Sequence, residues 1–599
     1  MCGIFGYVGK QNKAADIVLE GLKLLEYRGY DSWGVAAKIY NSESKIKNYF
    51  LIEKHVGKIG NARLNSEFST LNSGLAIGHT RWATHGGVTV ANAHPHTDCT
   101  KSIAVVHNGI VENFQELKDD LVKKGHKFIS QTDTEVIPHL IEDNLKHEGF
   151  ASSVRDAFNS LKGLSAIVVA NAVSKEIIAA KTGSPLVVGV SKDELFVASD
   201  ASAIVKHTRK VIFLEDNQMV ILGEKLKLIR LPDGKEIKPN FHILDWVFKE
   251  SEKGQFKHFF IKEIFEEPRV IQNTAIHGLS QAKNLAELID QAYGTFLIAC
   301  GSASYAATGA VYLFSKIAKK HVNFAVGSEF KYMEDFITPK TLVIPISQSG
   351  ESIDVIEPTL RAKKEKKAKI AAIVNVLGST LYRISDFKLL LESGPERSVA
   401  ASKSFIAMVA VLILTAYTLA GKQKKGQDLL KKAANSVKRI LLQGYIEKVK
   451  KVAEKLKDKE HIYIIGRGLA HTAALEATLK IKELSYIHAE AFPGGELKHG
   501  VIALIEKGTP CIVFAPNDET YDDIVSNAQE IKARGGYIIG IGPKNNNVFD
   551  DFMETGDIKE ATILPQVTVS HLLGYYLSLA CGIKDPDKPR NLAKSVTVK

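Results

Sequence analysis

The sequence predicts a multidomain protein in which an α+β layered sandwich precedes two doubly wound α/β units with parallel sheets. The length of 599 residues exceeds what one hydrophobic core accommodates. Short β-like runs with few helical patterns occupy residues 1–240. Beyond residue 257, continuous apolar runs alternate with helical patterns, and two of these runs recur in the same order.

The first part of the chain reads mainly as short strands. Its β-like runs are "GLAIGHTRWATHGG", "IAVVHNGIVENF", "LSAIVVANAV", "LFVASD" and "QMVILG". Helical periodicity is confined to residues near 13–26 and 115–124. Many strands with a few helices are typical of a layered α+β domain.

The second part has longer apolar strands, among them "TLVIPISQSGES", "KIAAIVNVLG", "PCIVFAPND" and "GYIIGIGP". Strands of this kind, alternating with helices, predict parallel sheets covered on both faces. "LIACGSASYAATGA" resembles the later "IIGRGLAHTAALEA", and "TLVIPISQSGES" resembles "TPCIVFAPNDET" at nearly the same offset. Two matches in register indicate a duplicated α/β unit.

These patterns predict the division of the chain into domains. We expect a first domain at 1–240, a charged linker at 241–257, α/β domains at 258–430 and 431–588, and a tail at 589–599. Residues 431–457 predict a helical connection. The longest apolar run, 405–420, is shorter than the roughly 18 residues of a membrane span. It predicts a buried helix that ends at Gly421.

Composition excludes several classes of protein. The net charge of +11 comes from lysines dispersed among acids, and the densest stretch, "LRAKKEKKAK", reads as a solvated helix face. We therefore expect no nucleic-acid partner and no membrane association. The start of the chain, "MCGIFGYVGK", lacks the basic and apolar segments of a secretory signal.

The cysteines indicate the compartment. All five are scattered, and none forms a CxxC pair: Cys2, Cys99, Cys300, Cys511 and Cys581. This spacing argues against a disulfide framework or a zinc site and favours a reducing cytosol. We expect a cytoplasmic protein with no metal and no cofactor.

Cys2 directly follows the initiator methionine. Because Cys is small, removal of Met1 would leave Cys2 with a free α-amine beside its thiol. A nucleophile and a proton acceptor would then share one residue. An accidental cysteine at a frayed end explains the first residues equally well, so the rest of the chain must decide.

Polar clusters inside the apolar runs of the first domain suit an amino-acid substrate. Arg81 could bind the α-carboxylate in a bidentate contact and Asp133 the ammonium, with a structural salt bridge as the alternative. The Asn108 amide and the Gly109 N–H could stabilise an oxyanion. The alternative there is a hairpin turn, which Asn-Gly favours.

Six motifs of this domain occur in one order: "CGIFGYVG", "EYRGYDS", "GHTRWATHG", "NAHPH", "HNGIVEN" and "TDTEV". The set resembles class II glutamine amidotransferases, which are N-terminal-nucleophile hydrolases with an αββα sandwich. The resemblance implies Cys2 as nucleophile, its own α-amine as base, and Asn108 and Gly109 at the oxyanion.

The same resemblance implies how glutamine is held. The residues implied are Arg81, Thr84, His85 and Asp133, with Trp82 near the exit for ammonia. "RGYDSWG" departs from the family pattern because Trp33 stands where a small residue is expected. That departure concerns the packing around Arg28.

"TLVIPISQSGESIDVIEPTL" runs from an apolar strand through a hydroxyl-rich turn into a helix. Four polar side chains gather at that helix N-terminus: Ser347, Gln348, Ser349 and Ser352. Backbone N–H groups and hydroxyls there make an anion site. Because the loop lacks Lys, Arg and the P-loop spacing, it suits a sugar phosphate. An N-cap with surplus serines is the alternative.

"EATLKIKELSYIHAEAFPGGELKHG" is the other concentration of polar residues. Lys480 and Glu483 are three apart on a helical pattern and share a face. Such a pair is usually a surface ion pair, but the apolar and aromatic neighbours predict a desolvated Glu483 suited to general-base chemistry. His499 follows a glycine-containing loop.

This half resembles sugar isomerase (SIS) domains in two copies, and the whole chain resembles the glutamine–fructose-6-phosphate aminotransferases (isomerizing), or glucosamine-6-phosphate synthases. The most specific motifs are "CGIFG", "SQSGES", "SYIHAEAFPGGELKHG" and "PRNLAKSVTV". The resemblance implies that Glu483 moves the proton between sugar C1 and C2 and that His499 assists ring opening. It also implies that Lys594 forms a Schiff base with the open-chain carbonyl and that Lys480 assists near the reacting carbons.

Two spots depart from the pattern of this family. "CGSASY" is one residue longer than expected, so either Ser302 or Ser304 takes the substrate role. "SVAASKSF" has Ala401 and Ser402 where Ser and then Thr are expected, which concerns a hydroxyl contact to the sugar.

The resemblance implies synthesis of glucosamine 6-phosphate and glutamate from fructose 6-phosphate and glutamine, with ammonia passing through an internal channel on domain closure. The alternatives are a glutamine-dependent aminotransferase for a different keto-sugar phosphate and a sugar-phosphate-sensing protein without catalysis. The presence of Cys2, Glu483 and Lys594 argues against a sensor. We expect a homodimer or a higher homo-oligomer.

Overall fold

The computed structural model describes residues 2–39, 49–69, 71–244 and 253–596. The chain forms two compact units: Met1–Ser251 with Ala593–Lys599, and Glu252–Leu592. Residues 245–252 of the predicted linker lie outside the described residues.

The first unit contains two antiparallel sheets. One sheet has eight strands in the order β15 (His242–Ile243), β11 (Lys210–Phe213), β9 (Val187–Val190), β10 (Glu194–Ala198), β1 (Gly3–Gly9), β4 (Leu75–Arg81), β2 (Ser32–Lys38) and β3 (Phe50–Val56). The other has seven, in the order β14 (Glu236–Ile237), β13 (Lys227–Arg230), β12 (Gln218–Leu222), β8 (Glu176–Lys181), β7 (Ser165–Asn171), β6 (Ile103–Gly109) and β5 (His96–Thr97).

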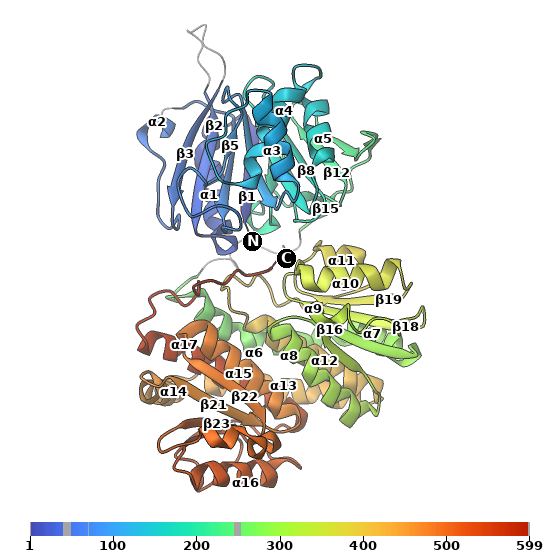
Figure 1. Ribbon diagram of the computed structural model, residues 1–599. Helices are drawn as coiled ribbons and strands as arrows, with labels where there is room; N and C mark the ends of the chain where they lie inside the picture. Colours follow the sequence, from blue (N-terminus) through green and yellow to red (C-terminus); the bar gives the residue numbers. More distant parts are fainter. Residues whose placement is uncertain (1, 40–48, 70, 245–252, 597–599) are drawn as a thin grey trace. The chain divides into compact units, whose positions relative to one another are not determined.

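The two sheets pack face to face. Apolar side chains of β1 and β4 on one sheet, and of β6, β7 and β8 on the other, form one buried cluster between them. Helix α1 (Ala14–Leu25) packs on the outer face of the first sheet. The outer face of the second is covered by α3 (Phe114–Lys123), α4 (Val136–Asn144) and α5 (Phe150–Ser160) (Figure 1). The αββα sandwich is therefore confirmed.

Helices α1 and α3 lie where the sequence predicts helices. The sequence reading missed α4 and α5. Helix α4 is nine residues long and carries Pro138 in its first turn. Proline is tolerated there, since the first helical N–H groups have no intrahelical acceptor. A short α2 (Ser66–Ser69) also belongs to this unit.

The second unit contains two five-stranded parallel sheets. The first has the order β17 (Asn323–Val326), β16 (Gly294–Ala299), β18 (Thr341–Ser347), β19 (Lys369–Val374) and β20 (Phe387–Leu390). The second has the order β22 (His488–Pro493), β21 (His461–Gly466), β23 (Pro510–Phe514), β24 (Tyr537–Gly542) and β25 (Asp551–Glu554). Both orders are 2-1-3-4-5 by position along the chain, so the predicted duplication is confirmed.

Helices surround both sheets. The longer ones are α6 (Phe259–His277), α7 (Leu279–Gln291), α8 (Ser302–Leu313), α10 (Ile353–Lys364), α12 (Lys403–Leu419), α13 (Gln423–Ile440), α14 (Gln443–Leu456), α15 (Leu469–Ser485), α16 (Tyr521–Lys532) and α17 (Ile563–Ala580). Two short helices are α9 (Gly327–Phe330) and α11 (Thr380–Ile384). Helices α13 and α14 form the predicted helical connection, and residue 430, the expected end of the first α/β domain, lies inside α13.

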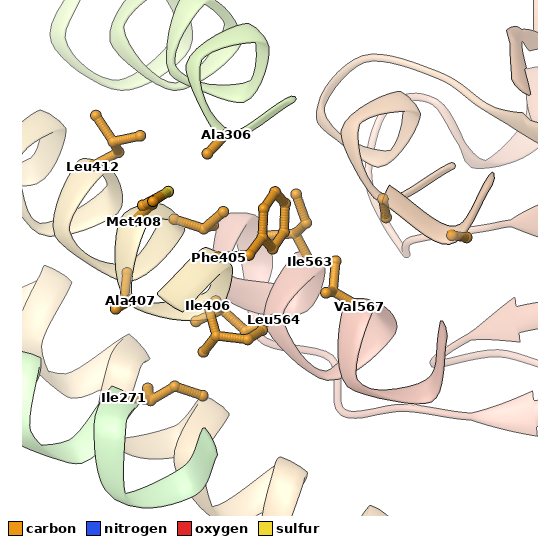
Figure 2. Packing of buried hydrophobic residues seen from close by; sticks show 14 of the residues in the cluster. Ile271, Ala306, Phe405, Ile406, Ala407, Met408, Leu412, Ile563, Leu564 and Val567 are labelled. Atoms are coloured by element: carbon orange, nitrogen blue, oxygen red, sulfur yellow. The ribbon is translucent and has the colours of Figure 1, made fainter. Parts of the chain in front are cut away.

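Helix α12 is the predicted buried helix and forms the centre of the core of this unit. Its side chains, such as Phe405 and Met408, pack among residues of α6, α8 and α17 (Figure 2). The helix ends before Gly421, whose φ of +69° suits glycine. In the described part of the chain, no helix combines the length and apolarity that crossing a membrane requires.

Candidate active sites

The thiol of Cys2 lies against the residue that follows β4. Its Sγ accepts a hydrogen bond from the Trp82 backbone N–H at 3.2 Å and lies 3.5 Å from the Trp82 carbonyl oxygen. The Cys2 carbonyl accepts hydrogen bonds from Arg28 Nε at 3.2 Å and from Asn108 Nδ2 at 3.1 Å. These contacts hold residue 2 at the start of β1 with its thiol half-buried. Met1, on whose removal a free α-amine at Cys2 depends, lies outside the described residues.

Asn108 and Gly109 end β6, where both pair with β7. They belong to a strand ladder, so the alternative of a hairpin turn is wrong. The Asn108 Nδ2 donates to Ser199 Oγ at 2.9 Å as well as to the Cys2 carbonyl. Gly109 has a φ of +144°, and a Cβ at this position would lie 2.2 Å from the Leu164 carbonyl oxygen, so only glycine fits.

Four buried histidines surround this site, and the sequence analysis gave them no role: His79, His94, His96 and His107. His79 Nε2 lies 3.0 Å from Asn108 Oδ1 and 3.0 Å from the His107 carbonyl oxygen. Because both partners are acceptors, Nε2 carries the proton and orients the Asn108 amide. Burial lowers the pKa of all four rings, and that of His79 to about 3, which keeps them neutral. All four lie inside the quoted motifs "GHTRWATHG", "NAHPH" and "HNGIVEN", which was their signal in the sequence.

Arg81 is buried at the end of β4. Its guanidinium donates to the backbone carbonyls of residues 85–87. Asp133 is not among these hydrogen-bond acceptors of Arg81. Its carboxylate instead accepts from the Val111 N–H at 2.7 Å. Burial lowers the pKa of Arg81, and the charges of Cys2 and Asp133 oppose that shift, so both groups lie within electrostatic reach of the guanidinium.

The loop after Arg81 carries the other expected glutamine contacts. The Trp82 ring packs edge-on against Tyr30 with centroids 5.6 Å apart, and the His85 ring packs edge-on against Phe114 at 4.9 Å. Thr84 is exposed. One strand end and its loop thus hold four of the expected residues, and one of them, Trp82, contacts the Cys2 thiol through its backbone.

The predicted phosphate loop runs from the last residue of β18 to the N-terminus of α10. Ser347 Oγ accepts from the Gly350 N–H at 3.0 Å, and Ser349 Oγ accepts from the Glu351 N–H at 3.1 Å. Gly350 has a φ of +67°, and a Cβ there would lie 2.1 Å from Ser379 Oγ. The tight loop therefore requires glycine at this position.

Two observations favour an anion site over a simple helix cap. Ser352 is the N-cap residue of α10, but its side chain makes no capping hydrogen bond within the described structure. The loop, which includes Gln348, follows β18, and Ser302 follows the neighbouring strand β16. Ligands of doubly wound sheets bind where the strand order reverses, which is between these two strands.

The two candidate serines of "CGSASY" have different partners. Ser302 Oγ donates to Glu476 Oε1 of α15 at 3.1 Å. Ser304 Oγ donates to the Gly301 carbonyl of its own turn at 2.7 Å. Ser302 is therefore part of a side-chain network with α15, whereas Ser304 stays within the strand-to-helix turn at the edge of the sheet.

Lys480 lies fully buried on α15. Its Nζ lies 2.6 Å from Glu483 Oε2 and 3.5 Å from Glu476 Oε1. The alternative of a surface ion pair is therefore wrong for Lys480, while the Glu483 side chain keeps 17% exposure. Burial alone would lower the pKa of Lys480, but the carboxylates of Glu476 and Glu483 raise it above its ordinary value and keep the ammonium charged.

Residues that the sequence analysis missed extend this network. His571 Nε2 lies 3.4 Å from Glu476 Oε1, and His571 Nδ1 lies 2.6 Å from Glu267 Oε1. The other Glu267 oxygen accepts from Thr568 Oγ1 at 2.6 Å. Burial would lower the pKa of His571, but the charges of Glu267 and Glu476 raise it to about 9. These side chains of α6, α17 and α15 form a row of alternating charges: Glu267, His571, Glu476, Lys480 and Glu483. We call this set the charge row.

His499 lies at the end of a 3₁₀ turn after β22 and is exposed. Because β22 runs parallel to β21, this turn lies at the carboxyl edge of the second sheet, where α15 begins. Glu483 lies near the other end of α15, about 20 Å away along the helix axis by the helical rise. The structure therefore does not bring His499 and Glu483 of one chain together.

The C-terminal tail enters at the end of α15. Tyr486, which ends that helix with a φ of +65°, accepts a hydrogen bond at Oη from the Arg590 N–H at 2.9 Å. The Arg590 guanidinium lies over the same ring, 4.2 Å from its centroid. Lys594 is half-buried and falls in Ala593–Lys599, the segment that belongs to the first unit.

Models of known families match both units. A glutamine amidotransferase domain matches residues 79–206, and a SIS domain matches residues 288–417 and 455–553. The chain is 42% identical to a glutamine–fructose-6-phosphate aminotransferase (isomerizing) of Thermococcus kodakarensis, and the match covers 100% of both proteins. The chain belongs to the glutamine–fructose-6-phosphate aminotransferase (isomerizing) family. A relative of the same name in Thermus thermophilus is 39% identical, again over 100% of both chains.

A solved structure of this family is similar to the second unit. It is the C-terminal domain of glucosamine-fructose-6-phosphate aminotransferase from Francisella tularensis, with 32% identity and a TM-score of 0.51. The match covers 55% of this chain and 98% of that one.

The departures from the family pattern fit the structure locally. Trp33 is buried in β2, and its ring stacks on His55 with centroids 4.5 Å apart, while Arg28 keeps its contact with the residue 2 carbonyl. In "SVAASKSF", the departure at Ala401 and Ser402, the Ser402 N–H donates to Glu396 Oε1 at 3.0 Å. The segment around Ala401 is thus held by a backbone hydrogen bond to a buried carboxylate.

Proposed function

We propose that this chain converts D-fructose 6-phosphate and L-glutamine into D-glucosamine 6-phosphate and L-glutamate. One observation carries the proposal: a single chain combines a thiol at residue 2 of an αββα sandwich with a hydroxyl-rich loop and a buried Lys–Glu pair in the parallel-sheet unit. Ammonia released from glutamine in the first unit is the nitrogen source for the sugar in the second.

In the glutaminase unit, the Cys2 sulfur attacks the side-chain carbonyl carbon of glutamine. The free α-amine of Cys2 takes the thiol proton and passes it to the departing ammonia, and water then hydrolyses the thioester. The Gly109 N–H and the Asn108 amide stabilise the oxyanion. Support for Asn108 comes from His79, which orients its amide so that Nδ2 points to residue 2.

Arg81 binds the glutamine carboxylate, and Asp133 binds the ammonium, with Thr84 and His85 on the loop between them and Trp82 near the exit for ammonia. Support comes from the charge of Asp133, which acts on the buried guanidinium. Because the carbonyls of residues 85–87 accept from Arg81, binding of a carboxylate requires this loop to exchange those hydrogen bonds.

In the isomerase unit, the phosphate group binds at the carboxyl ends of the neighbouring strands β16 and β18. The residues that we assign to it are Ser304, Ser347, Gln348, Ser349 and Ser352. Ser302 instead supports Glu476. Glu483 transfers the proton between C1 and C2, because its partly exposed carboxylate is the only end of the charge row described here that reaches solvent. The Lys480 ammonium lies 2.6 Å from that carboxylate and holds it in place.

Lys594 forms the Schiff base with the open-chain sugar. Its support is the docking of Arg590 on Tyr486, three residues beyond Glu483.

His499 assists ring opening from a second copy of the chain. Support comes from its exposure and from the length of α15 that separates it from Glu483 of the same chain. We therefore also propose a homodimer or higher homo-oligomer. The cytoplasm is the proposed location, in keeping with the free state of all five cysteines.

The test is incubation of the purified chain with glutamine and fructose 6-phosphate. We expect glucosamine 6-phosphate and glutamate in equal amounts. The alternative, a different keto-sugar phosphate as acceptor, is tested by the same assay with other ketose phosphates. Glutamate release without amino sugar, or a higher kcat/KM for another ketose phosphate, would overturn the proposed acceptor.

A further inference from the structure

A cluster of metal-binding side chains lies in the first unit, outside both active sites. Cys99 follows β5, His126 follows α3, and His139 and Glu142 lie one turn apart on α4. One ligand atom of each lies within 4.8 Å of all the others. His126 and His139 are buried, Glu142 is half-buried and Cys99 is exposed.

Four distances between the ligand atoms are close to those of a tetrahedral site. Cys99 Sγ lies 3.6 Å from His139 Nδ1 and 3.8 Å from His126 Nδ1. Glu142 Oε2 lies 3.3 Å from His139 Nδ1 and 3.0 Å from His126 Nδ1. Bonds of about 2.3 Å to sulfur and about 2.0–2.1 Å to nitrogen or oxygen separate the ligands of a tetrahedral zinc ion by about 3.3–3.6 Å. Four of the six ligand-to-ligand distances, at 3.0–3.8 Å, are thus close to those of a tetrahedral zinc site, and the remaining two pairs lie within 4.8 Å.

Both histidines also have a carboxylate on their far side. Asp143 Oδ1 lies 3.9 Å from His126 Nε2, and Glu135 Oε1 lies 3.9 Å from His139 Nε2. Each ring thus points Nδ1 into the cluster and Nε2 toward an acid. At 3.9 Å these pairs are longer than hydrogen bonds, so each acid acts on its ring through its charge, which favours a proton on Nε2 and leaves the inner nitrogen free to bind metal.

We propose that Cys99, His126, His139 and Glu142 bind a zinc ion. A thiolate with two imidazoles suits zinc, and the thiolate and carboxylate together balance its two positive charges. Because the protein supplies all four ligands, the site is closed and structural, with no position left for substrate. The sequence argued against zinc because the chain has no CxxC pair; here the ligands come from segments that only the fold assembles.

The zinc ion would hold the segment that carries part of the glutamine site. Helix α4 directly follows the turn Asp133–Glu135. The Glu135 carboxylate accepts from the N–H groups of Ile129 and Ser130 at 2.8 and 2.7 Å. Zinc therefore ties α4, the loop before it and the turn after β5 into one rigid piece.

A metal-free explanation exists and makes different predictions. If both histidines carry their proton on Nδ1, both donate to Glu142, and the Cys99 N–H also donates to Glu142 Oε2, at 3.2 Å. The cluster would then be a hydrogen-bonded group with an idle thiol. Metal binding and the optical spectrum of a metal–thiolate bond separate the two explanations.

The experiment uses the full chain, freed of metal with a chelator and titrated with Co²⁺. We expect one Co²⁺ per chain, a thiolate-to-cobalt charge-transfer band in the near ultraviolet, strong visible bands of a tetrahedral ion, and loss of all of them when one equivalent of Zn²⁺ is added. Cys99→Ser should lose the charge-transfer band, and Cys581→Ser, a half-buried cysteine of the second unit, should keep it. Asp143→Asn should weaken zinc binding, because it removes the negative charge that faces His126 Nε2.

Absence of a charge-transfer band in the wild type, or the same band in Cys99→Ser as in Cys581→Ser, would overturn the proposal. Loss of the band in Cys2→Ala but not in Cys99→Ser would place the metal at the catalytic thiol instead and would overturn it too. Hydrogen exchange supplies a second measurement if a variant folds poorly. In the wild type, zinc should slow exchange of residues 126–144 selectively, and equal exchange with and without zinc would also count against the site.

Discussion

The buried histidine of the charge row makes stability depend on pH in a predictable direction. Glu267 and Glu476 raise the pKa of His571 from 6.5 to about 9. A group whose pKa is raised on folding stabilises the folded state fully below its unfolded pKa, and that contribution is lost as pH rises through the folded pKa. A shift of about 2.5 units at about 1.4 kcal/mol each amounts to about 3 kcal/mol. The second unit should therefore lose about 3 kcal/mol of stability between about pH 6 and about pH 10.

His571→Gln removes this dependence. At low pH, the variant should be less stable than the wild type by about 3–5 kcal/mol, because two buried carboxylates lose their shared cation. As the pH rises, the difference between the two proteins should shrink by about 3 kcal/mol, which is roughly a hundredfold change in opening constant.

Hydrogen exchange of α15 and α17, read by mass spectrometry and corrected for the intrinsic rate at each pH, measures the opening free energy at the site itself. Tryptophan fluorescence is less suitable, because Trp33 and Trp82 lie in the first unit. His461→Gln removes an exposed histidine of the same unit and should follow the wild type. If the opening free energies of His571→Gln and the wild type change equally with pH, the acidic neighbours do not raise the pKa of His571, and the reasoning fails.

Three further predictions test the proposed sites. Cys2→Ala should abolish glutamate release while isomerisation of hexose phosphates continues, measured by separate assays; release at the wild-type rate would exclude Cys2 as nucleophile. Ser349→Ala should raise the KM for fructose 6-phosphate by roughly 10–150-fold, since a hydrogen bond to a charged group contributes about 1.5–3 kcal/mol; an unchanged sugar KM would remove Ser349 from the site. Lys594→Arg should abolish amino-sugar synthesis and the borohydride-trapped adduct with fructose 6-phosphate, because a guanidinium keeps the charge but forms no imine; full synthesis by this variant would contradict the assignment.

The sequence by itself determined the class of each unit. Burial of both faces makes the strands of the second unit continuously apolar, and the duplication appears as two matched runs, so the parallel sheets and their repeat follow from local patterns. Helix α12 follows from one uninterrupted apolar run. The loop of "SQSGES" was recognisable because its hydroxyls and its glycine lie within six residues.

The tertiary structure alone decided what lies beside those motifs. No local pattern pairs His571 with Glu267, which is 304 residues away in sequence, or joins Cys99 to His126 and His139. The same holds for the separation of His499 from Glu483, which depends on the direction of β22 and the length of α15. Periodicity along a chain reports which face of an element is buried, because burial repeats every two or every 3.6 residues. It carries no information on which distant charge shares that burial, since that partner is chosen by the packing of whole helices and sheets.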